Sequence, residues 1–289
     1  MKRYKNYLFI LPAIILLLVV VFFPALRCFY LSFFHNVKTS AEPSYFVGLS
    51  NYVTVFADKW FYSSLYNTIV FTVISVSLEF ILGLGMALLL NTSFKGRGLA
   101  RACVLVPWAL PPAVMAMAWG WMYDGTYGVF NDILLRLGII SSPVAWLGKP
   151  TLAMGALIFA DVWKTTPFIM IILLAGLQSI PRDLYEAIKM DGAGWWGQFR
   201  RITLPLLKSY IVLAILFRTI HAFGVFDLVW VLTGGGPGGA TQTISLYIYN
   251  NLYRYLNLGY AASLTIVTAL ILLIIAVIIS LLHRTQVEY

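Results

Sequence analysis

The sequence predicts an all-α membrane protein with six transmembrane helices, and three observations lead to that prediction. Of its 289 residues, 61% are hydrophobic and 11% are charged, whereas soluble domains are about half apolar and a quarter charged. The apolar residues gather in segments of roughly 20 to 29 residues, the length that a helix needs to cross a hydrocarbon core of about 30 Å. Lys and Arg concentrate in alternate connections between these segments. A water-soluble fold, a disordered chain and a disulfide scaffold are therefore excluded.

Six segments are long and apolar enough to span a bilayer. They run over Tyr7–Tyr30, Tyr62–Leu90, Ala102–Met122, Leu152–Leu177, Leu206–Leu232 and Tyr260–Leu282. The alternating pattern of a membrane β-barrel strand is absent, so each segment is predicted to be a helix. Pro107, Pro111 and Pro112 interrupt the third segment. Such breaks free backbone polar groups inside the membrane, and protein or a wet cavity must satisfy them.

The first segment is expected to remain in the chain as a span. Basic residues precede it, as in a secretory signal, at Lys2, Arg3 and Lys5. However, the apolar run is longer than a signal peptide needs, and it ends in Ala25–Phe29 rather than in the small residues of a cleavage site.

The basic residues of the connections set the expected orientation. With the N-terminus inside, the inner segments hold twelve Lys and Arg residues and the outer segments hold five. Because positively charged loops stay in the cytoplasm, both termini are predicted to be cytoplasmic. The net charge of +9 is then explained by these loops, and no nucleic-acid partner is expected. We expect a single transmembrane domain over residues 1–289, lying in the cytoplasmic membrane as a multi-pass protein.

The connection between the fourth and fifth spans carries the most informative pattern. From Ile180 to Ser209 it reads IPRDLYEAIKMDGAGWWGQFRRITLPLLKS. Pro181 suits the first turn of a short helix, and Gly192 tolerates the left-handed backbone that ends one. A second short helix is expected to follow, and Pro205 to begin the next span. This helix–turn–helix is either an interfacial amphipathic anchor or a docking surface for a soluble partner.

These residues resemble the EAA loop of ABC-importer permeases. The matching residues are Glu186, Ala187, Ile188, Asp191, Gly192, Ala193, Phe199, Ile202, Leu204 and Pro205. Two positions depart from the pattern, because Ile188 stands where a second alanine is usual and Ser209 where a second proline often follows. Further stretches look like the sugar-permease group of maltose, trehalose, glucosylglycerol or glycerol-phosphate importers, namely 107–112, 163–168, 174–178 and 226–241.

The resemblance implies the type I ABC-importer permease fold and a subunit that is not itself an enzyme. In that family the loop at residues 180–205, hereafter the coupling segment, docks into a cleft of an ATPase subunit. The implied coupling residues are Glu186, Ala187, Asp191, Gly192, Ala193, Phe199 and Pro205. The implied partners are a second homologous permease, two ATP-binding-cassette ATPase subunits and an extracytoplasmic substrate-binding protein. ATP and Mg would bind to the ATPase, and no cofactor is expected in this subunit.

Six ionisable side chains inside the predicted spans are candidates for a specific role, because insertion of a charge costs about 2.5–3.5 kcal/mol at the bilayer centre. They are Glu79, Asp161, Lys164, Arg218, His221 and Asp227. Asp161 and Lys164 are three residues apart on one helix face and can neutralise each other. The group forms either a structural charge cluster between helices or the wall of a polar cavity that binds sugar hydroxyls. For Glu79 we expect an interhelical hydrogen bond, and for His221 a satisfied interior position.

Aromatic side chains provide the flat apolar face on which a sugar ring can lie. Trp108, Trp119, Trp163 and Phe223 are the candidates, and interior packing or lipid contact is the alternative for each. The predicted substrate path therefore comprises Asp161, Trp163, Lys164, Arg218, His221, Phe223, Asp227 and Trp108.

The sequence lacks the motifs that would hydrolyse ATP or hold a metal. It contains no G-x-x-x-x-G-K-[ST], no H-E-x-x-H and no G-x-S-x-G pattern. The glycine-rich run at 234–239 is not followed by Lys-Ser/Thr and is predicted to be a turn. The three histidines and two cysteines are too scattered for a metal site.

The predicted function is therefore that of a permease subunit that translocates a carbohydrate by alternating access, driven by partner ATPases. The alternative is an ion-coupled secondary transporter of a small polar solute, using Glu79 or Asp161. Such carriers commonly contain internal repeats, and none is visible here. A membrane-embedded enzyme is the third possibility, and the missing catalytic motifs count against it.

Overall fold

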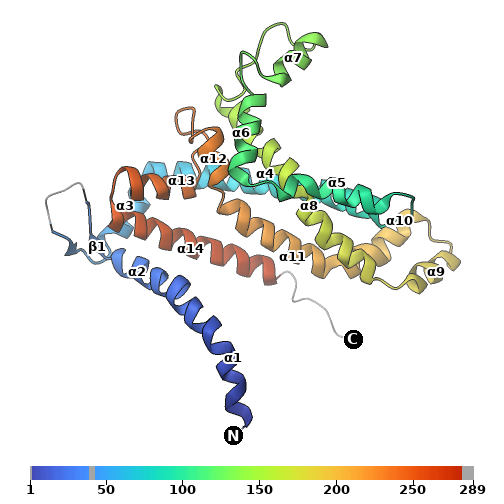
Figure 1. Ribbon diagram of the computed structural model, residues 1–289, viewed down its shortest axis with the longest axis horizontal. Helices are drawn as coiled ribbons and strands as arrows, with labels where there is room; N and C mark the ends of the chain where they lie inside the picture. The colour runs from blue at the N-terminus through green and yellow to red at the C-terminus, as the bar shows by residue number, and fades with distance from the viewer. Residues whose placement is uncertain (1, 39–42, 282–289) are drawn as a thin grey trace. The chain divides into compact units, whose positions relative to one another are not determined.

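The computed structural model describes residues 2–38 and 43–281, so that Leu282, His283 and Arg284, which entered the predictions above, lie outside the described residues. Within the described part, five helices are each long and apolar enough to cross a membrane, and two shorter helices bent by 90° bring the number to six if they are taken together as one span. Figure 1 shows that the chain is almost entirely helical. The predicted all-α architecture is confirmed, with one span broken.

Two compact units can be distinguished, and each is described by itself. The first comprises residues 1–62 and 247–271. Its elements are α1 (Lys2–Leu17), a π-turn (Leu18–Phe22), α2 (Phe23–Leu31), β1 (Phe34–His35), β2 (Tyr45–Phe46), α3 (Ser50–Ala57), a second π-turn (Asn250–Arg254) and most of α14 (Leu258–Leu281). The two strands form an antiparallel hairpin in which Phe34 lies opposite Phe46.

Polar side chains hold the first unit together. The amide of Asn51 donates hydrogen bonds to the carbonyls of Ser32 and Phe34, at 2.8 and 3.0 Å. The carboxylate of Asp58 accepts hydrogen bonds from the hydroxyls of Tyr247 and Tyr260. These bonds tie α3 and the residue after it to β1 and to α14.

The second unit comprises residues 63–246 and 272–289. Its elements are α4 (Lys59–Asn91, entering from the first unit), α5 (Arg97–Ala109), α6 (Pro112–Met122), α7 (Val129–Arg136), α8 (Pro150–Ser179), α9 (Arg182–Met190), α10 (Trp195–Gln198), a π-turn (Phe199–Thr203), α11 (Leu204–Phe223), α12 (Asp227–Leu232) and the start of α13 (Ile244–Tyr249). Helix α8 packs against α5 and α11, and α6 packs against α12. In Figure 1, α9 lies at one end of the α8–α11 pair and α12 near the other.

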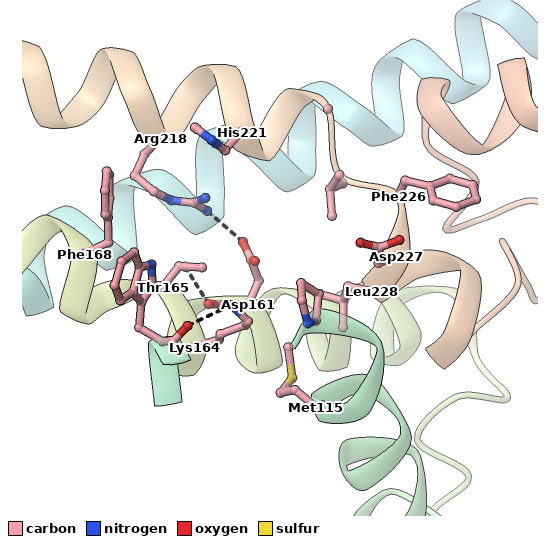
Figure 2. A pocket seen from close by; sticks show the side chains of 14 residues that line it. Met115, Asp161, Lys164, Thr165, Phe168, Arg218, His221, Phe226, Asp227 and Leu228 are labelled. Carbon is pink, nitrogen blue, oxygen red and sulfur yellow. Dashed lines mark hydrogen bonds and ion pairs between the residues drawn. The ribbon is translucent and has the colours of Figure 1, made fainter. Parts of the chain in front are cut away.

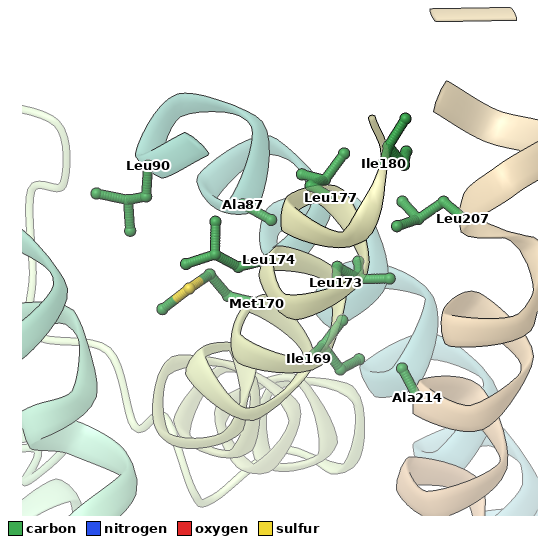
Figure 3. Close-up of a cluster of buried hydrophobic side chains, with 10 residues drawn as sticks. All are labelled: Ala87, Leu90, Ile169, Met170, Leu173, Leu174, Leu177, Ile180, Leu207 and Ala214. Carbon is green, nitrogen blue, oxygen red and sulfur yellow. The ribbon is translucent and has the colours of Figure 1, made fainter. Parts of the chain in front are cut away.

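The core of the second unit is built around the C-terminal half of α8 (Figure 3). Its buried side chains are Ala87, Leu90, Ile169, Met170, Leu173, Leu174, Leu177, Ile180, Leu207 and Ala214, from α4, α8, the residue after α8 and α11. Two glycines allow the helices to approach closely. A β-carbon at Gly83 would lie 2.9 Å from the Ile169 side chain, and one at Gly176 would lie 2.5 Å from the ring of Tyr210. Larger residues at these two points would push α4 and α11 away from α8.

The third predicted span, Ala102–Met122, is two helices rather than one. Helix α5 ends at Ala109 and α6 begins at Pro112, with a 90° bend between them. The physical reason is that Pro111 and Pro112 lack the backbone N–H groups that would continue the hydrogen bonding of α5. The interruption at Pro111 and Pro112 was correctly predicted, whereas Pro107 lies inside α5 and does not interrupt it. The size of the bend was not foreseen.

The fifth predicted span, Leu206–Leu232, is wrong at both ends. Helical backbone runs continuously from Trp195 to Phe223, so the second short helix and the span are one element, and α12 is separate. Pro205 therefore does not begin the span. A π-turn at Phe199–Thr203 precedes it, in which the N–H of Leu204 bonds to the carbonyl of Phe199. The wider turn accommodates a proline that would otherwise break the helix.

Candidate functional site

A pocket with a cavity volume of about 350 Å³ opens between α5, α6, α8, α11 and α12 (Figure 2). Its polar wall consists of Asp161, Lys164, Thr165, Arg218, His221 and Asp227, and its apolar wall includes Trp108, Met115, Phe168, Phe226 and Leu228. The structure thus brings together six of the eight residues predicted for the substrate path. These six come from four elements, and both α8 and α11 contribute through residues spaced at helical intervals.

A buried ion triad joins α4, α8 and α11 behind this pocket. Arg218 contacts both oxygens of Glu79, at 2.5 and 2.8 Å, and donates to Asp161 at 2.9 Å. Glu79 is fully buried, and the hydroxyl of Thr165 donates to it at 2.6 Å. Buried charges are tolerated only when they are paired and hydrogen-bonded in this way. Glu79 thus makes the interhelical hydrogen bond expected from the sequence.

The predicted neutralisation of Asp161 by Lys164 is wrong, because Asp161 takes Arg218 as its ion-pair partner. The ammonium of Lys164 instead donates to the carbonyl of Trp108, at 3.4 Å. In an unbroken helix that carbonyl would accept from residue 112, but Pro112 has no N–H. Lys164 therefore satisfies a backbone acceptor that the broken third span leaves free, as the membrane interior requires.

The aromatic candidates separate into two groups. Trp108 lines the pocket and stacks on Phe168, with ring centroids 6.0 Å apart. Phe223 does not line it, because its side chain is 2% exposed within the core. Trp163 also does not line it; this side chain faces a different, apolar pocket and contacts Trp119 edge-on, at 5.5 Å. Trp163 and Phe223 thus lie outside the pocket that holds the other six predicted residues.

Two polar residues sit where α11 gives way to α12. His221 is exposed rather than interior, and its Nδ1 lies 2.8 Å from the carbonyl of Phe217. Since a carbonyl only accepts, this contact places a proton on Nδ1. Asp227 begins α12, where its negative charge is favoured by the helix dipole.

Sequence reasoning missed Thr165 and Phe168, although the signal was present. Residues 161, 164, 165 and 168 follow the i, i+3, i+4, i+7 spacing of a single helix face. Phe226 was missed as well, and its position depends on the end of α11 at Gly224, which hydropathy does not reveal.

The coupling segment forms a surface structure in which most of the predicted residues are exposed. Helix α9 carries Glu186 and Ala187, and Asp191 and Gly192 form the turn after it, with Gly192 at φ +80°. Ala193 donates its N–H to the carbonyl of Ile188 at 3.1 Å, which closes the turn. The predicted end of the first short helix near Asp191 is confirmed. Large apolar side chains are exposed here as well, namely Leu184, Met190, Trp195 and Trp196.

Several contacts connect the coupling segment to the helical core. The hydroxyls of Tyr185 and Thr203 lie 3.0 Å apart, which joins α9 to the π-turn before α11. Tyr185 and Ile202 also pack against the core around α8. Phe199 lies within the π-turn and stacks on Trp195, with ring centroids 5.7 Å apart. Pro205 follows in the first turn of α11.

The glycine-rich run is a turn, as predicted, and it is held against α4. The amide of Asn67 donates to the carbonyls of Gly239 and Gln242, at 3.0 and 3.1 Å. Within the turn, the hydroxyls of Thr233 and Thr241 lie 2.8 Å apart. The loop is thereby fixed on the side of the unit where α8 begins and α11 ends.

Comparison with known proteins places the chain among transport proteins. Residues 79–287 match the family model "Binding-protein-dependent transport system inner membrane component". The chain is 48% identical to the trehalose/maltose transport system permease protein of Thermococcus litoralis over 93% of this chain and 90% of that protein. It is 43% identical to the sulfoquinovosyl glycerol transport system permease protein of Agrobacterium fabrum over 90% of this chain and 84% of that protein.

A solved structure shows the same fold. The chain matches a subunit of a bacterial ABC transporter involved in the import of the acidic polysaccharide alginate, with a TM-score of 0.86 and 25% identity, over 99% of this chain and 97% of that one. These relatives are transport permeases and not enzymes, which decides against the enzyme and the ion-coupled carrier. The chain is a multi-pass permease subunit of an ABC importer, and it belongs to the family of inner-membrane components of binding-protein-dependent transport systems.

Proposed function

We propose that this subunit forms one half of the path by which a carbohydrate crosses the membrane, and that its pocket contacts the sugar. The observation that carries the proposal is the composition of the pocket wall. Charged and polar side chains lie beside Trp108, whose face is stacked on Phe168 and half exposed. A sugar offers hydroxyls that donate and accept hydrogen bonds, and ring faces that lie on an aromatic plane. The volume of about 350 Å³ is within the range of small-molecule sites. The sugars named for the relatives support the same substrate class.

The energy for transport is supplied through the coupling segment by two ATP-binding-cassette ATPase subunits. These partners bind ATP and Mg, and this subunit holds no cofactor. The exposed apolar side chains of Met190, Trp195 and Trp196 offer a surface of the kind that protein interfaces cover. We place the coupling segment and both termini in the cytoplasm, in accord with the basic residues of the inner loops.

A second, homologous permease completes the path, because one subunit with six spans provides only one wall. An extracytoplasmic binding protein delivers the sugar to the outer loops, among them the glycine-rich turn held by Asn67. One structural relative was solved in complex with a periplasmic protein carrying an alginate pentasaccharide, which supports such an arrangement.

Transport by the reconstituted complete importer tests the proposal. Radiolabelled trehalose or maltose is supplied with the binding protein, and uptake into proteoliposomes is measured for Trp108→Ala and for the control Trp121→Ala. Trp121 lies on α6, is 69% exposed and does not line the pocket. Trp108→Ala is expected to reduce uptake at least about fivefold, since aromatic contacts to a ligand are commonly worth more than 1 kcal/mol. Wild-type uptake by Trp108→Ala would refute the assignment of the pocket.

Crosslinking tests the docking surface. Met190→Cys is expected to crosslink to an ATPase subunit, whereas Leu137→Cys, which is similarly well exposed but lies after α7, is not. The native Cys28 and Cys103 are replaced by serine in both variants. A failure of Met190→Cys to reach the ATPase would contradict the docking role.

A further inference from the structure

Acidic side chains outnumber basic ones at the pocket, and this bears on the charge of the solute if the pocket is the sugar site proposed above. Three carboxylates and two basic side chains lie in the wall or directly behind it. The carboxylates are Asp161 and Asp227 in the wall and Glu79 behind it, and the cations are Lys164 and Arg218. Taken together, the wall carries no positive excess that would attract an anion.

The guanidinium of Arg218 is held by protein groups on three of its N–H bonds. Nε donates to Glu79, and Nη2 donates to both Glu79 and Asp161. Two negative charges within hydrogen-bond distance therefore outweigh its single positive charge. The remaining Nη1 group can donate to a hydroxyl, but an incoming carboxylate or sulfonate would meet the two acidic side chains at the same place.

The other charged and polar groups present the same picture. The Lys164 ammonium donates to the Trp108 carbonyl, and Nδ1 of His221 lies against the carbonyl of Phe217. Asp227 adds an exposed carboxylate at the start of α12. The wall thus combines donors with a larger number of acceptors, and hydroxyl groups satisfy both kinds of partner.

We propose that this pocket selects uncharged polyhydroxy solutes over anionic sugars, and that Glu79 and Asp161 set this preference by neutralising Arg218. Removal of either carboxylate's charge leaves the guanidinium balanced by a single carboxylate, which removes the negative excess beside it and relaxes the preference. The proposal rests on the proposed function, since it concerns the same pocket. Family membership does not decide the matter, because the sugars named for the relatives include both neutral and acidic ones.

Ligand binding to the complete importer in nanodiscs, without its binding protein, tests this preference at the permease itself. The probes are trehalose and its monocarboxylate, a uronate of the same size, titrated by saturation-transfer NMR. Wild type is expected to bind trehalose at least about tenfold more tightly than the uronate, because the carboxylates of Glu79 and Asp161 repel the negative charge of the uronate. Glu79→Gln and Asp161→Asn are each expected to shift the ratio of the two affinities about tenfold toward the uronate.

Matched controls keep the outcomes distinct. Asp132→Asn removes a carboxylate on α7 that pairs with Arg136 at the surface, and it should leave the ratio unchanged. Size-exclusion chromatography identifies any variant that does not fold, and Asp161→Asn retains Glu79 as a partner of Arg218. The proposed preference is overturned if wild type binds both sugars equally, or if the ratio of the two affinities is unchanged in the folded variants. Either result leaves the proposed function standing. Binding of neither sugar overturns the proposed function together with the preference.

Discussion

Replacement of Gly192 by valine tests whether the turn after α9 transmits work between the ATPase and the spans. Gly192 has φ +80°, and no atom lies within 4 Å of the position that a β-carbon would take. The cost of a side chain here is therefore confined to the backbone. For an L-residue the left-handed conformation costs about 1–2 kcal/mol, and for a β-branched residue it is a genuine outlier. The observed turn would then be populated roughly 5- to 30-fold less than in wild type.

Two further variants separate the turn from other effects of substitution. Gly194 also has no atom within 4 Å of its β-position, but its φ is −69°, so Gly194→Ala should be tolerated. Asparagine adopts the left-handed region more readily than other residues, so Gly192→Asn should retain most of the activity. We expect uptake to be highest in Gly192→Asn, lower in Gly192→Ala and lowest in Gly192→Val.

Uptake and ATP hydrolysis are measured in the same proteoliposomes, which contain the complete importer and its binding protein. Gly192→Val is expected to insert and fold normally, because the turn is exposed, yet to lose uptake at least about fivefold. The reasoning is refuted if Gly192→Val couples hydrolysis to uptake as wild type does. It is refuted equally if Gly194→Ala is damaged as much as Gly192→Val.

Three other predictions concern stability. Gly176→Ala should lower the unfolding temperature in detergent, because its β-carbon would overlap the ring of Tyr210 on α11. Such overpacking costs about 1–3 kcal/mol. Gly155→Ala is the control: its β-carbon meets no atom within 4 Å, so the unfolding temperature should not change. Arg218→Met leaves two buried carboxylates without their ion-pair partner, a loss of about 3–5 kcal/mol, so fluorescence-detected size-exclusion should find little folded subunit. Burial raises the pKa of Asp58, but hydrogen bonds from two tyrosines and the backbone outweigh this and lower it. The stability that Asp58 contributes is thus present above its unfolded pKa of about 3.9 and is lost as the pH falls below that value. In a plot of unfolding temperature against pH, Asp58→Asn should therefore show a smaller decrease at acid pH than wild type.

The spans were predictable because twenty apolar residues in a row have few alternatives to crossing a bilayer. Their ends were less predictable where proline and π-turns combine. Pro205 looked like a helix start, but the wider turn before it lets the helix continue from Trp195. The same spacing recurs in the first span, where a π-turn at Leu18–Phe22 precedes Pro24. Hydropathy reports neither arrangement.

The pocket was predictable in part, and the error has a definite origin. Nearness along the helix favoured pairing of Asp161 with Lys164, whereas the actual partner, Arg218, is 57 residues away and reaches Asp161 through the packing of α11 on α8. Trp163 was placed in the path as an aromatic face for a sugar ring, without regard to the side of α8 on which it lies. Adjacent positions on a helix point about 100° apart, and strict use of that period would have rejected Trp163 and found Phe168.

The coupling segment and the pocket are connected because the same helices carry both. Asp161 lies 18 residues before the end of α8, so the pocket is roughly 27 Å from α9 along the helix axis. Over that distance α4, α8 and α11 are locked at one end by the apolar core and at the other by the ion triad of Glu79, Asp161 and Arg218.

Close-packed cores resist gradual deformation, and ion pairs between buried groups are lost after small displacements. A push on the coupling segment therefore moves these three helices together rather than bending them. The remaining pocket walls are attached differently, because α6 follows a 90° break and α12 follows the end of α11 at Gly224. Relative motion is thus expected where α4, α8 and α11 meet α6 and α12, and the pocket lies at this boundary. Displacement at the proposed docking surface would consequently change the shape of the proposed sugar site without any need to unfold or distort the helices that transmit it.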